Sequence, residues 1–254
     1  MLPSHTWRIA HRGARDEAPE NTRTAFERAL QYPIDGIELD VQMSADGVAV
    51  IYHDATLKRV SGGRRRVSET TYAQLAVLDW GRWFHADFSR EPLLTLEQTL
   101  ALFAHRTRLL IEIKSTPTEN RSGHTERLTR EVVRLLGQMP PTVDPAHIYV
   151  LSFDPQALWL THQLAPHWRC VLNVPEYAPH QVMGLTQAEI EFLWAIDVRI
   201  GRLSAALTGW AKDRGLQLFT YTCNGTRQVQ KALHLGVDAI LSDRPCWLTE
   251  YLGK

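Results

Sequence analysis

The feature that most constrains the fold of this chain is a regular alternation of short apolar runs with amphipathic segments. Eight runs have the length and composition of buried strands: Trp7–His11, Gly36–Val41, Leu109–Lys114, Ile148–Phe153, Arg169–Val174, Phe192–Val198, Leu216–Thr222 and Ala239–Ser242. Most of the intervals have helical periodicity: Asn21–Gln31, Leu96–Phe103, Thr125–Leu136, Gln156–Leu164, Ser204–Arg214 and Thr226–Leu235. Eight strand–helix units in 254 residues match a (β/α)8 TIM barrel, so we expect this α/β fold.

Several of the predicted helices have recognisable starts. Thr95 with Gln98 and Thr186 with Glu189 have the spacing of capping boxes, and Asp154 precedes a proline at the first helical position. A doubly wound open sheet is the structural alternative. No glycine-rich phosphate fingerprint follows the first strand, so the sequence favours the barrel.

The segment from Thr56 to Pro92 interrupts the alternation, because it contains no convincing core strand. It holds the run SGGRRR and four clustered aromatic residues, Trp80, Trp83, Phe84 and Phe88. We interpret residues at about 56–92 as an insertion after the second strand that caps one barrel mouth, within a single domain spanning 1–254. Its arginines, Arg64–Arg66, are expected to form a solvated loop rather than a ligand site.

The overall charge balance excludes one class of partner. Lysine plus arginine and aspartate plus glutamate both number 28, so the chain lacks the bulk positive field typical of nucleic-acid or anionic-membrane proteins. Any anion must be bound by a local site. We therefore expect a small-molecule partner, no nucleic acid and no stable membrane insertion, and the sequence leaves the oligomeric state open.

Cysteine usage and hydropathy indicate the compartment. The three cysteines, Cys170, Cys223 and Cys246, have no CxxC spacing, which predicts neither a disulfide framework nor a zinc site and favours a reducing cytoplasm. The stretch MLPSHTWRIAHRG lacks the apolar centre of a signal peptide. No apolar run approaches the ~20 residues that a bilayer span requires. We expect a cytoplasmic protein.

Two predicted strands carry polar pairs on one face. Residues i and i+2 of a strand share a side, so Glu38 lies with Asp40, and Glu112 lies with Lys114. At the C-terminal end of barrel strands that side is the mouth where barrel enzymes place catalytic groups. Three carboxylates there would repel one another unless a cation neutralised them, and all-oxygen ligands favour Mg²⁺ or Ca²⁺.

A turn returns a histidine to the same mouth. Asp46-Gly47 is a strong two-residue hairpin signal, which predicts that His53 lies opposite Asp40; a bulge would shift this register by one residue. His11 and Arg12 leave the first strand together. Two histidines, a metal, and the cations Arg12 and Lys114 suit an anionic substrate that needs protons moved at both oxygens of a displacement, as a phosphodiester does.

Each of these residues also has a purely structural interpretation. Glu112 and Lys114 could form a buried ion pair, His53 could cap a turn, and Glu38 could be an edge charge. Together they favour a site, because burying each charge costs several kcal/mol unless it is paired. Cys223 also ends a strand, but no histidine neighbours it, and a packed residue is expected there.

Seven motifs, in order, carry a resemblance to a known family: AHRG, PENT, IELDVQMSADGVAVIYHDATLKR, IEIK, LSFDPQAL, YTCN and GVDAILSDRP. In this order they resemble the glycerophosphodiester phosphodiesterase family, and the chain looks most like its short, unexported bacterial members. The resemblance implies a TIM barrel with a small insertion after the HD motif. It also implies hydrolysis of glycerophosphodiesters to sn-glycerol 3-phosphate and an alcohol, within lipid and glycerol metabolism.

The resemblance also implies roles for individual residues. By the family's pattern one divalent cation is bound by Glu38, Asp40 and Glu112, while His11 and His53 act as acid and base. Arg12 and Lys114 are implied to contact phosphate, with Glu20 in a supporting role. The family commonly has tryptophan before TVN, where this chain has Tyr221 before Thr222-Cys223-Asn224. Tyrosine keeps an aromatic wall on the leaving-alcohol side but is smaller.

Three questions stay open at the level of sequence. Family analogy suggests that a neighbouring glycerol hydroxyl attacks first and gives a cyclic phosphate, but direct attack by water is the alternative. A lysophospholipase D-type activity is an alternative to the simple diesterase, and an apolar groove beside the insertion aromatics would favour it. A non-catalytic barrel that binds phosphorylated metabolites is the third reading, although no expected histidine or carboxylate is missing.

Overall fold

The structure is a computed structural model that describes residues 6–175 and 179–253. Residues 1–5 lie outside the described residues. They begin the stretch MLPSHTWRIAHRG, which is expected not to be a signal peptide. Among the described residues, no helix combines the length and the apolar composition needed to span a membrane.

The described strands form one sheet that closes on itself, because β1 pairs in parallel with both β9 and β2. The eight parallel strands of this barrel are β1 (Trp7–His11), β2 (Gly36–Met43), β4 (Arg108–Ile113), β5 (Ile148–Ser152), β6 (Arg169–Val174), β7 (Leu193–Arg199), β8 (Gln217–Tyr221) and β9 (Ala239–Ser242). β3 (Ala49–Ile51) adds to β2 antiparallel. The predicted TIM barrel with an insertion after the second strand is confirmed, and β1, β6 and β9 have the predicted bounds.

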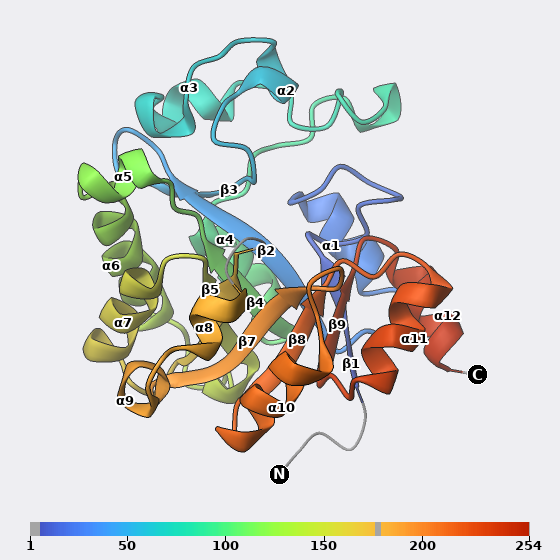
Figure 1. Ribbon diagram of the computed structural model, residues 1–254. Helices are drawn as coiled ribbons and strands as arrows, with labels where there is room; N and C mark the ends of the chain where they lie inside the picture. The colour runs from blue at the N-terminus through green and yellow to red at the C-terminus, as the bar shows by residue number, and fades with distance from the viewer. Residues whose placement is uncertain (1–5, 176–178, 254) are drawn as a thin grey trace.

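Helices surround the barrel (Figure 1). The described ones outside the insertion are α1 (Arg23–Ala29), α4 (Leu96–Phe103), α5 (Pro117–Arg121), α6 (His124–Leu136), η3 (Pro145–His147), α7 (Pro155–Leu164), α8 (Pro179–Met183), α9 (Gln187–Ile190), α10 (Ala205–Asp213), α11 (Thr226–His234) and α12 (Pro245–Leu252). The capping boxes at Thr95 and Thr186 and the Asp154 N-cap are confirmed. Apolar helix faces and the outward strand residues form the main core between the two layers.

The lower half of the barrel interior is filled by a second apolar core. Trp7 stacks on Trp194 with ring centroids 6.0 Å apart, and both rings contact Tyr149 and Phe219. Aliphatic residues from alternate strand positions, such as Ile9 and Leu110, complete this cluster. We call it the aromatic floor. Arg108 and Arg169 lie over its rings from the N-terminal ends of their strands, and polar side chains follow above it at the C-terminal ends.

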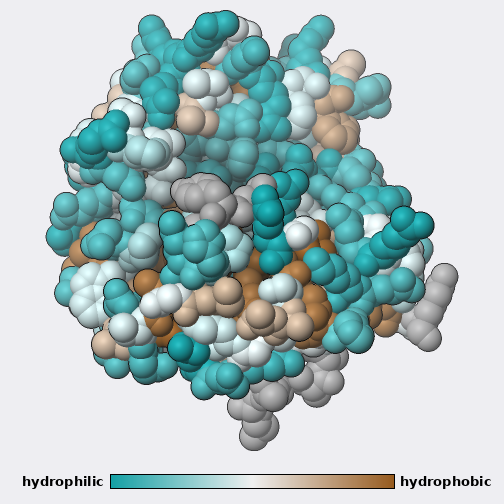
Figure 2. All heavy atoms as spheres, in the orientation of Figure 1, coloured by the Kyte–Doolittle hydropathy of each residue, from teal (hydrophilic) through white to brown (hydrophobic). Residues whose placement is uncertain are grey.

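The insertion has its own small core. It contains α2 (Lys58–Ser61), η1 (Val67–Glu69), α3 (Tyr72–Ala76) and η2 (Ala86–Phe88), and it lies over the barrel mouth at the top of Figure 1. Trp80 packs edge-on to Tyr52 at 4.9 Å within a cluster of buried apolar residues. Hydrophilic side chains cover most of the insertion on the face in Figure 2. Arg64 and Arg65 are exposed, as predicted, whereas Arg66 pairs with Glu119 at 3.0 Å.

The two-residue hairpin predicted at Asp46-Gly47 is wrong by one position. The observed pairs are Val41 with Ile51 and Met43 with Ala49, so Tyr52 rather than His53 lies opposite Asp40, as its N–H donates to Asp40 O at 3.0 Å. The Ser44 N–H donates to Val48 O at 2.9 Å, which leaves Ala45, Asp46 and Gly47 as a three-residue loop; Gly47 has φ +89°, whereas Asp46 lacks the positive φ that a two-residue turn would require. This is the one-residue shift considered as the alternative, and His53 still reaches the barrel mouth.

Gly13, immediately after His11 and Arg12, provides a test of the local packing. Its φ is +83°, and a Cβ atom there would lie 2.7 Å from the backbone carbon of Ala25. Replacing Gly13 with alanine should therefore lower the free energy of unfolding by about 2 kcal/mol or more, measured by urea denaturation. Gly201→Ala is the control, since its added Cβ meets no atom within 4 Å, and it should change stability by less than ~0.5 kcal/mol. Equal effects of the two substitutions would contradict this account.

Candidate active site

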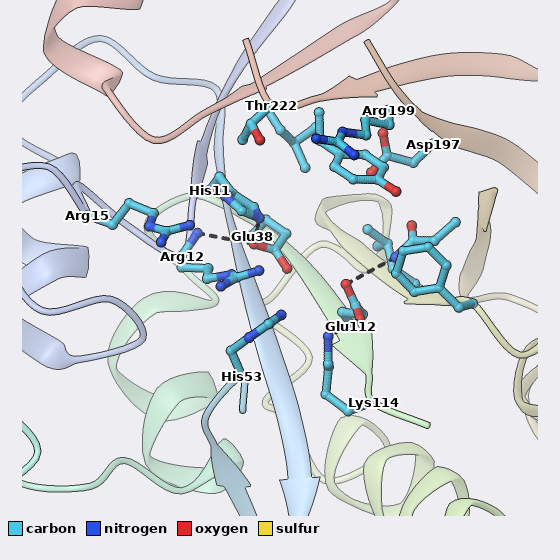
Figure 3. Close-up of a pocket in the computed structure, with 15 residues that line it drawn as sticks. His11, Arg12, Arg15, Glu38, His53, Glu112, Lys114, Asp197, Arg199 and Thr222 are labelled. Atoms are coloured by element: carbon cyan, nitrogen blue, oxygen red, sulfur yellow. Dashed lines mark hydrogen bonds and ion pairs between the residues drawn. The ribbon is translucent and has the colours of Figure 1, made fainter. Parts of the chain in front are cut away.

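A ring of polar side chains lies above the aromatic floor, because successive inward positions of adjacent strands are polar at their C-terminal ends. The strand register places His11 beside Glu38, Asp40 beside Glu112, and Asn173 beside Asp197. The ring surrounds a cavity of about 380 Å³. Figure 3 shows His11, Arg12 and Arg15 on one side of it and Glu112, Asp197 and Arg199 on the other.

Three carboxylates form a compact buried cluster. Glu38, Asp40 and Glu112 each offer an oxygen, and these three oxygens all lie within 4.8 Å of one another. The residues are 2%, 0% and 8% exposed. The structure thus brings together the three side chains predicted to hold a metal.

Two cationic side chains lie directly against the cluster. Arg12 Nε is 3.0 Å from Asp40 Oδ2, while Lys114 Nζ is 2.7 Å from Glu112 Oε1 and 3.3 Å from Asp40 Oδ1. Burial favours the neutral acid, yet Arg12 and Lys114 hold the pKa of Asp40 well below its usual range. For Glu38, burial and the Asp40 charge win over Arg12 and raise the pKa well above its ordinary value. Two cations therefore leave three carboxylates incompletely compensated.

The cluster fits a divalent cation. Glu38 Oε1 is buried and accepts no hydrogen bond from any described residue, and Asp40 Oδ1 is buried with only the Lys114 ammonium 3.3 Å away. Buried carboxylate oxygens that lack hydrogen bonds are costly, and hard cations such as Mg²⁺ and Ca²⁺ prefer such oxygens as ligands. The donor set contains no thiolate or imidazole within the 4.8 Å group. A divalent ion is the ligand that these atoms suit best.

His11 is held by an aspartate that follows the last barrel strand. Its Nδ1 lies 2.6 Å from Asp243 Oδ1, and Asp243 also accepts a hydrogen bond from Asn224 Nδ2 at 2.7 Å. An ionised carboxylate can only accept, so the His11 proton on Nδ1 is fixed and Nε2 is left to exchange protons. Burial lowers the pKa of His11 below its ordinary value, although the bond to Asp243 opposes this shift. The ring lines the cavity as a neutral base.

His53 has a parallel arrangement on the opposite side. Its Nδ1 lies 2.9 Å from Asp54 Oδ1, and the ring lines the same cavity with about a third of its side chain exposed. Arg59 holds Asp54 through Nε and Nη2 at 2.9 and 2.7 Å. Each histidine thus presents Nε2 to the cavity and an aspartate to Nδ1.

Glu20 lies behind the cavity wall and bridges three arginines. Its carboxylate is 3.0 Å from Arg12, 2.8 Å from Arg15 and 3.0 Å from Arg59. Glu20 is 5% exposed and is absent from the residues that line the cavity. Burial would raise its pKa, but these arginines lower it below the ordinary value, so the carboxylate is charged and orients guanidinium groups.

The remaining wall is partly aromatic and partly polar. Tyr221 and Phe153 pack edge-on with centroids 6.4 Å apart, and both line the cavity. Asn173 donates to Glu112 Oε2 at 3.1 Å. Its own Oδ1 and Asp197 Oδ1 are buried without a hydrogen-bond partner among the described residues. Both atoms belong to cavity-lining residues, so the wall offers acceptors for hydroxyl groups.

Several site residues were missed at the level of sequence: Arg15, Asn21, Asp54, Arg59, Asn173, Asp197, Asn224 and Asp243. Asn173 and Asp197 stand two residues beyond buried interior positions of their strands, and Asp243 directly follows the last strand. The i, i+2 rule applied to every strand would have found these three. Asn21, whose Nδ2 donates to Asp40 Oδ2 at 2.8 Å, lies in a loop, where no periodic signal exists.

Comparisons with known proteins agree on one family. The profile of the glycerophosphoryl diester phosphodiesterase family matches residues 11–246. A glycerophosphodiester phosphodiesterase of Caldanaerobacter subterraneus subsp. tengcongensis is 30% identical over 97% of this chain and 97% of its own length. One from Bacillus subtilis (strain 168) is 30% identical over 96% of this chain and 86% of its length.

A solved structure adds the product of the reaction in a similar protein. It is an Oleispira antarctica phosphodiesterase in complex with the product sn-glycerol-3-phosphate. It is 26% identical, superposes with a TM-score of 0.83, and the match covers 97% of this chain and 96% of that one.

The His11–Asp243 pair predicts a specific dependence of stability on pH. Burial opposes ionisation, but the hydrogen bond from His11 and the charge of Arg15 lower the pKa of Asp243 to about 2. A carboxyl group with a lowered folded-state pKa stabilises the fold above its ordinary value of 3.8 and loses that contribution as the pH falls towards about 2. In urea unfolding between pH 4 and pH 2, Asp243→Asn should therefore flatten the fall in stability. Curves of equal steepness would contradict the pairing.

Proposed function

Because this chain belongs to the glycerophosphoryl diester phosphodiesterase family, and is a glycerophosphodiester phosphodiesterase, we propose that it hydrolyses its substrate with a divalent cation and two histidines. The products are sn-glycerol 3-phosphate and an alcohol. The observation that carries the proposal is the pair of aspartate-held histidines that line one cavity with the buried carboxylate cluster. A cytoplasmic location is part of the proposal, supported by the three cysteines, which are all free thiols.

The metal site comprises Glu38, Asp40 and Glu112 in this proposal. A bound Mg²⁺ or Ca²⁺ would neutralise these carboxylates and stabilise the negative charge that develops on the phosphoryl oxygens. Asn21 and Asn173 orient two of the ligands, since they donate to Asp40 and Glu112 at 2.8 and 3.1 Å. Such neighbours fix carboxylate rotamers and so set the affinity of the site.

The histidines move the two protons of the displacement. One histidine accepts the proton of the attacking hydroxyl at Nε2, and the other donates a proton to the oxygen of the leaving alcohol. Asp243 and Asp54 hold the two rings in the tautomer that leaves Nε2 available, and they stabilise each ring when it becomes positive. Neutral His11 suits the base, because burial lowers its pKa.

The substrate's charged and polar groups meet complementary side chains. Arg12 and Lys114 carry the charge that binds the phosphate, and Glu20 positions Arg12 from behind. Asn173 Oδ1 and Asp197 Oδ1 supply acceptors for the glycerol hydroxyls. Tyr221 forms the aromatic wall on the leaving-alcohol side with Phe153.

Removal of the metal tests the first part of this mechanism. Chelator-treated protein should release no glycerol 3-phosphate from glycerophosphoethanolamine, and Mg²⁺ or Ca²⁺ should restore the reaction. Glu112→Gln should weaken cation binding in calorimetry by about tenfold or more, because a ligand charge is lost. Glu119→Gln is the matched control, an equally buried carboxylate that pairs with Arg66 outside the cluster, and it should bind the cation normally. Failure to hydrolyse any of several diesters with either cation would favour a non-catalytic phosphate-binding barrel.

Substitution of each histidine tests proton transfer. His11→Gln and His53→Gln should each lower kcat for glycerophosphoethanolamine by about 10²- to 10⁴-fold, whereas His105→Gln, an exposed control, should not. A p-nitrophenyl ester of glycerol phosphate needs no proton on its leaving group. The variant that lacks the general acid should therefore recover most of its rate with this ester, which identifies the acid. Near-normal kcat in both variants would refute histidine catalysis.

A further inference from the structure

A second cavity of about 570 Å³ lies beside the catalytic one, between α7 and the α8–α9 segment. Its size is within the range of small-molecule sites. Its lining is mainly aromatic and aliphatic, and Glu189 is the one charged residue in it among the described residues. Glu189 accepts hydrogen bonds from the N–H and the hydroxyl of Thr186, so its charge is already used in a helix cap.

The cavity exposes hydrophobic side chains that a soluble protein would otherwise cover. Phe153 and Trp159 are 37% and 40% exposed, and Trp159 packs edge-on to Phe192 at 5.2 Å. Leu185 and Val182 contribute aliphatic surface from the other side. A contiguous apolar hollow of this kind is favourable for a hydrocarbon and has no cation that could bind a phosphate.

The two cavities are neighbours that share one lining residue. Phe153 lines both, and it stands two residues beyond Leu151, an interior residue of the barrel, so its ring reaches the mouth. The catalytic cavity is charged and the neighbouring one is apolar. Together they match a molecule with a charged diester at one end and a hydrocarbon at the other.

We propose that the second cavity binds a single hydrocarbon chain of the diester substrate, so the enzyme acts on single-chain amphiphilic glycerophosphodiesters. This inference rests on the proposed function, because the catalytic cavity holds the charged end. An apolar groove beside the insertion aromatics would have favoured a lysophospholipase D-type activity. Of these aromatics, Trp80 is buried in the insertion core, and the apolar cavity lies by α7 instead. In the substrate, the hydrocarbon chain is attached either to the glycerol unit or to the leaving alcohol.

Binding of non-hydrolysable amphiphiles tests the cavity without catalysis. Calorimetry with butyl, hexyl and octyl phosphate on the Mg²⁺-loaded protein should show Kd falling about two- to fourfold per added methylene. Trp159→Gln and Leu185→Gln, which make the lining polar, should each reduce that dependence. Leu233→Gln, at an exposed leucine on α11 outside this cavity, is the control and should retain it. Equal Kd values for the three phosphates, or an unchanged dependence in both cavity variants, would overturn the proposal.

Hydrolysis then identifies which alcohol carries the chain. Monoacyl glycerophosphocholines place the chain on glycerol, whereas glycerophosphoalkanols place it on the leaving group. A rise of kcat/KM with chain length in either series, lost in Trp159→Gln, supports the proposal and names the source. If glycerophosphoethanolamine is hydrolysed but kcat/KM does not rise with chain length in either series, the hydrocarbon-site proposal is overturned while the proposed function stands. If no diester is hydrolysed but chain-dependent binding persists, the catalytic proposal fails and the binding site remains.

Discussion

Glu38, Asp40 and Glu112 are buried side by side at the barrel mouth. The arrangement of the side chains around them follows from the need to stabilise their charges. Burying a charge costs several kcal/mol unless partners compensate, so cations and amide donors have to converge on one place. Arg12 meets this need with a backbone φ of +59°, since its N–H donates to Glu38 while its guanidinium reaches Asp40. Strained backbone of this kind is tolerated where the surroundings determine it fully.

The insertion packs on β3 through its apolar core, and it also reaches the candidate active site through a charged side chain. Arg59 belongs to α2, yet it contacts Asp54 beside His53 and Glu20 behind Arg12. Its guanidinium also lies 4.5 Å from the Trp83 ring. The segment that interrupts the alternating pattern therefore holds Asp54, and through it His53, in position at the cavity.

Most of the fold and part of the site followed from two patterns in the sequence. The alternation of apolar runs with amphipathic segments predicted the strands, and the alternation of sides along a strand paired Glu38 with Asp40 and would also have found Asn173 and Asp197. The hairpin register did not follow, because Asp46-Gly47 suits both a two-residue turn and a three-residue loop, which differ in whether Asp46 has a positive φ. Asn21, Arg15 and Arg59 lie in loops or in the insertion, where contacts depend on tertiary packing and leave no local signal.

The aromatic floor fills the lower half of the barrel interior, and the cavity lies above it at the mouth. Tyr149 and Phe219 are fully buried, and Trp7 and Trp194 pack against both rings, so aromatic side chains fill the lower half of the described barrel. Substrate arrives and both products depart through the same entrance, which the insertion overhangs. A product molecule that stayed in the cavity would therefore block the entry of the next substrate molecule.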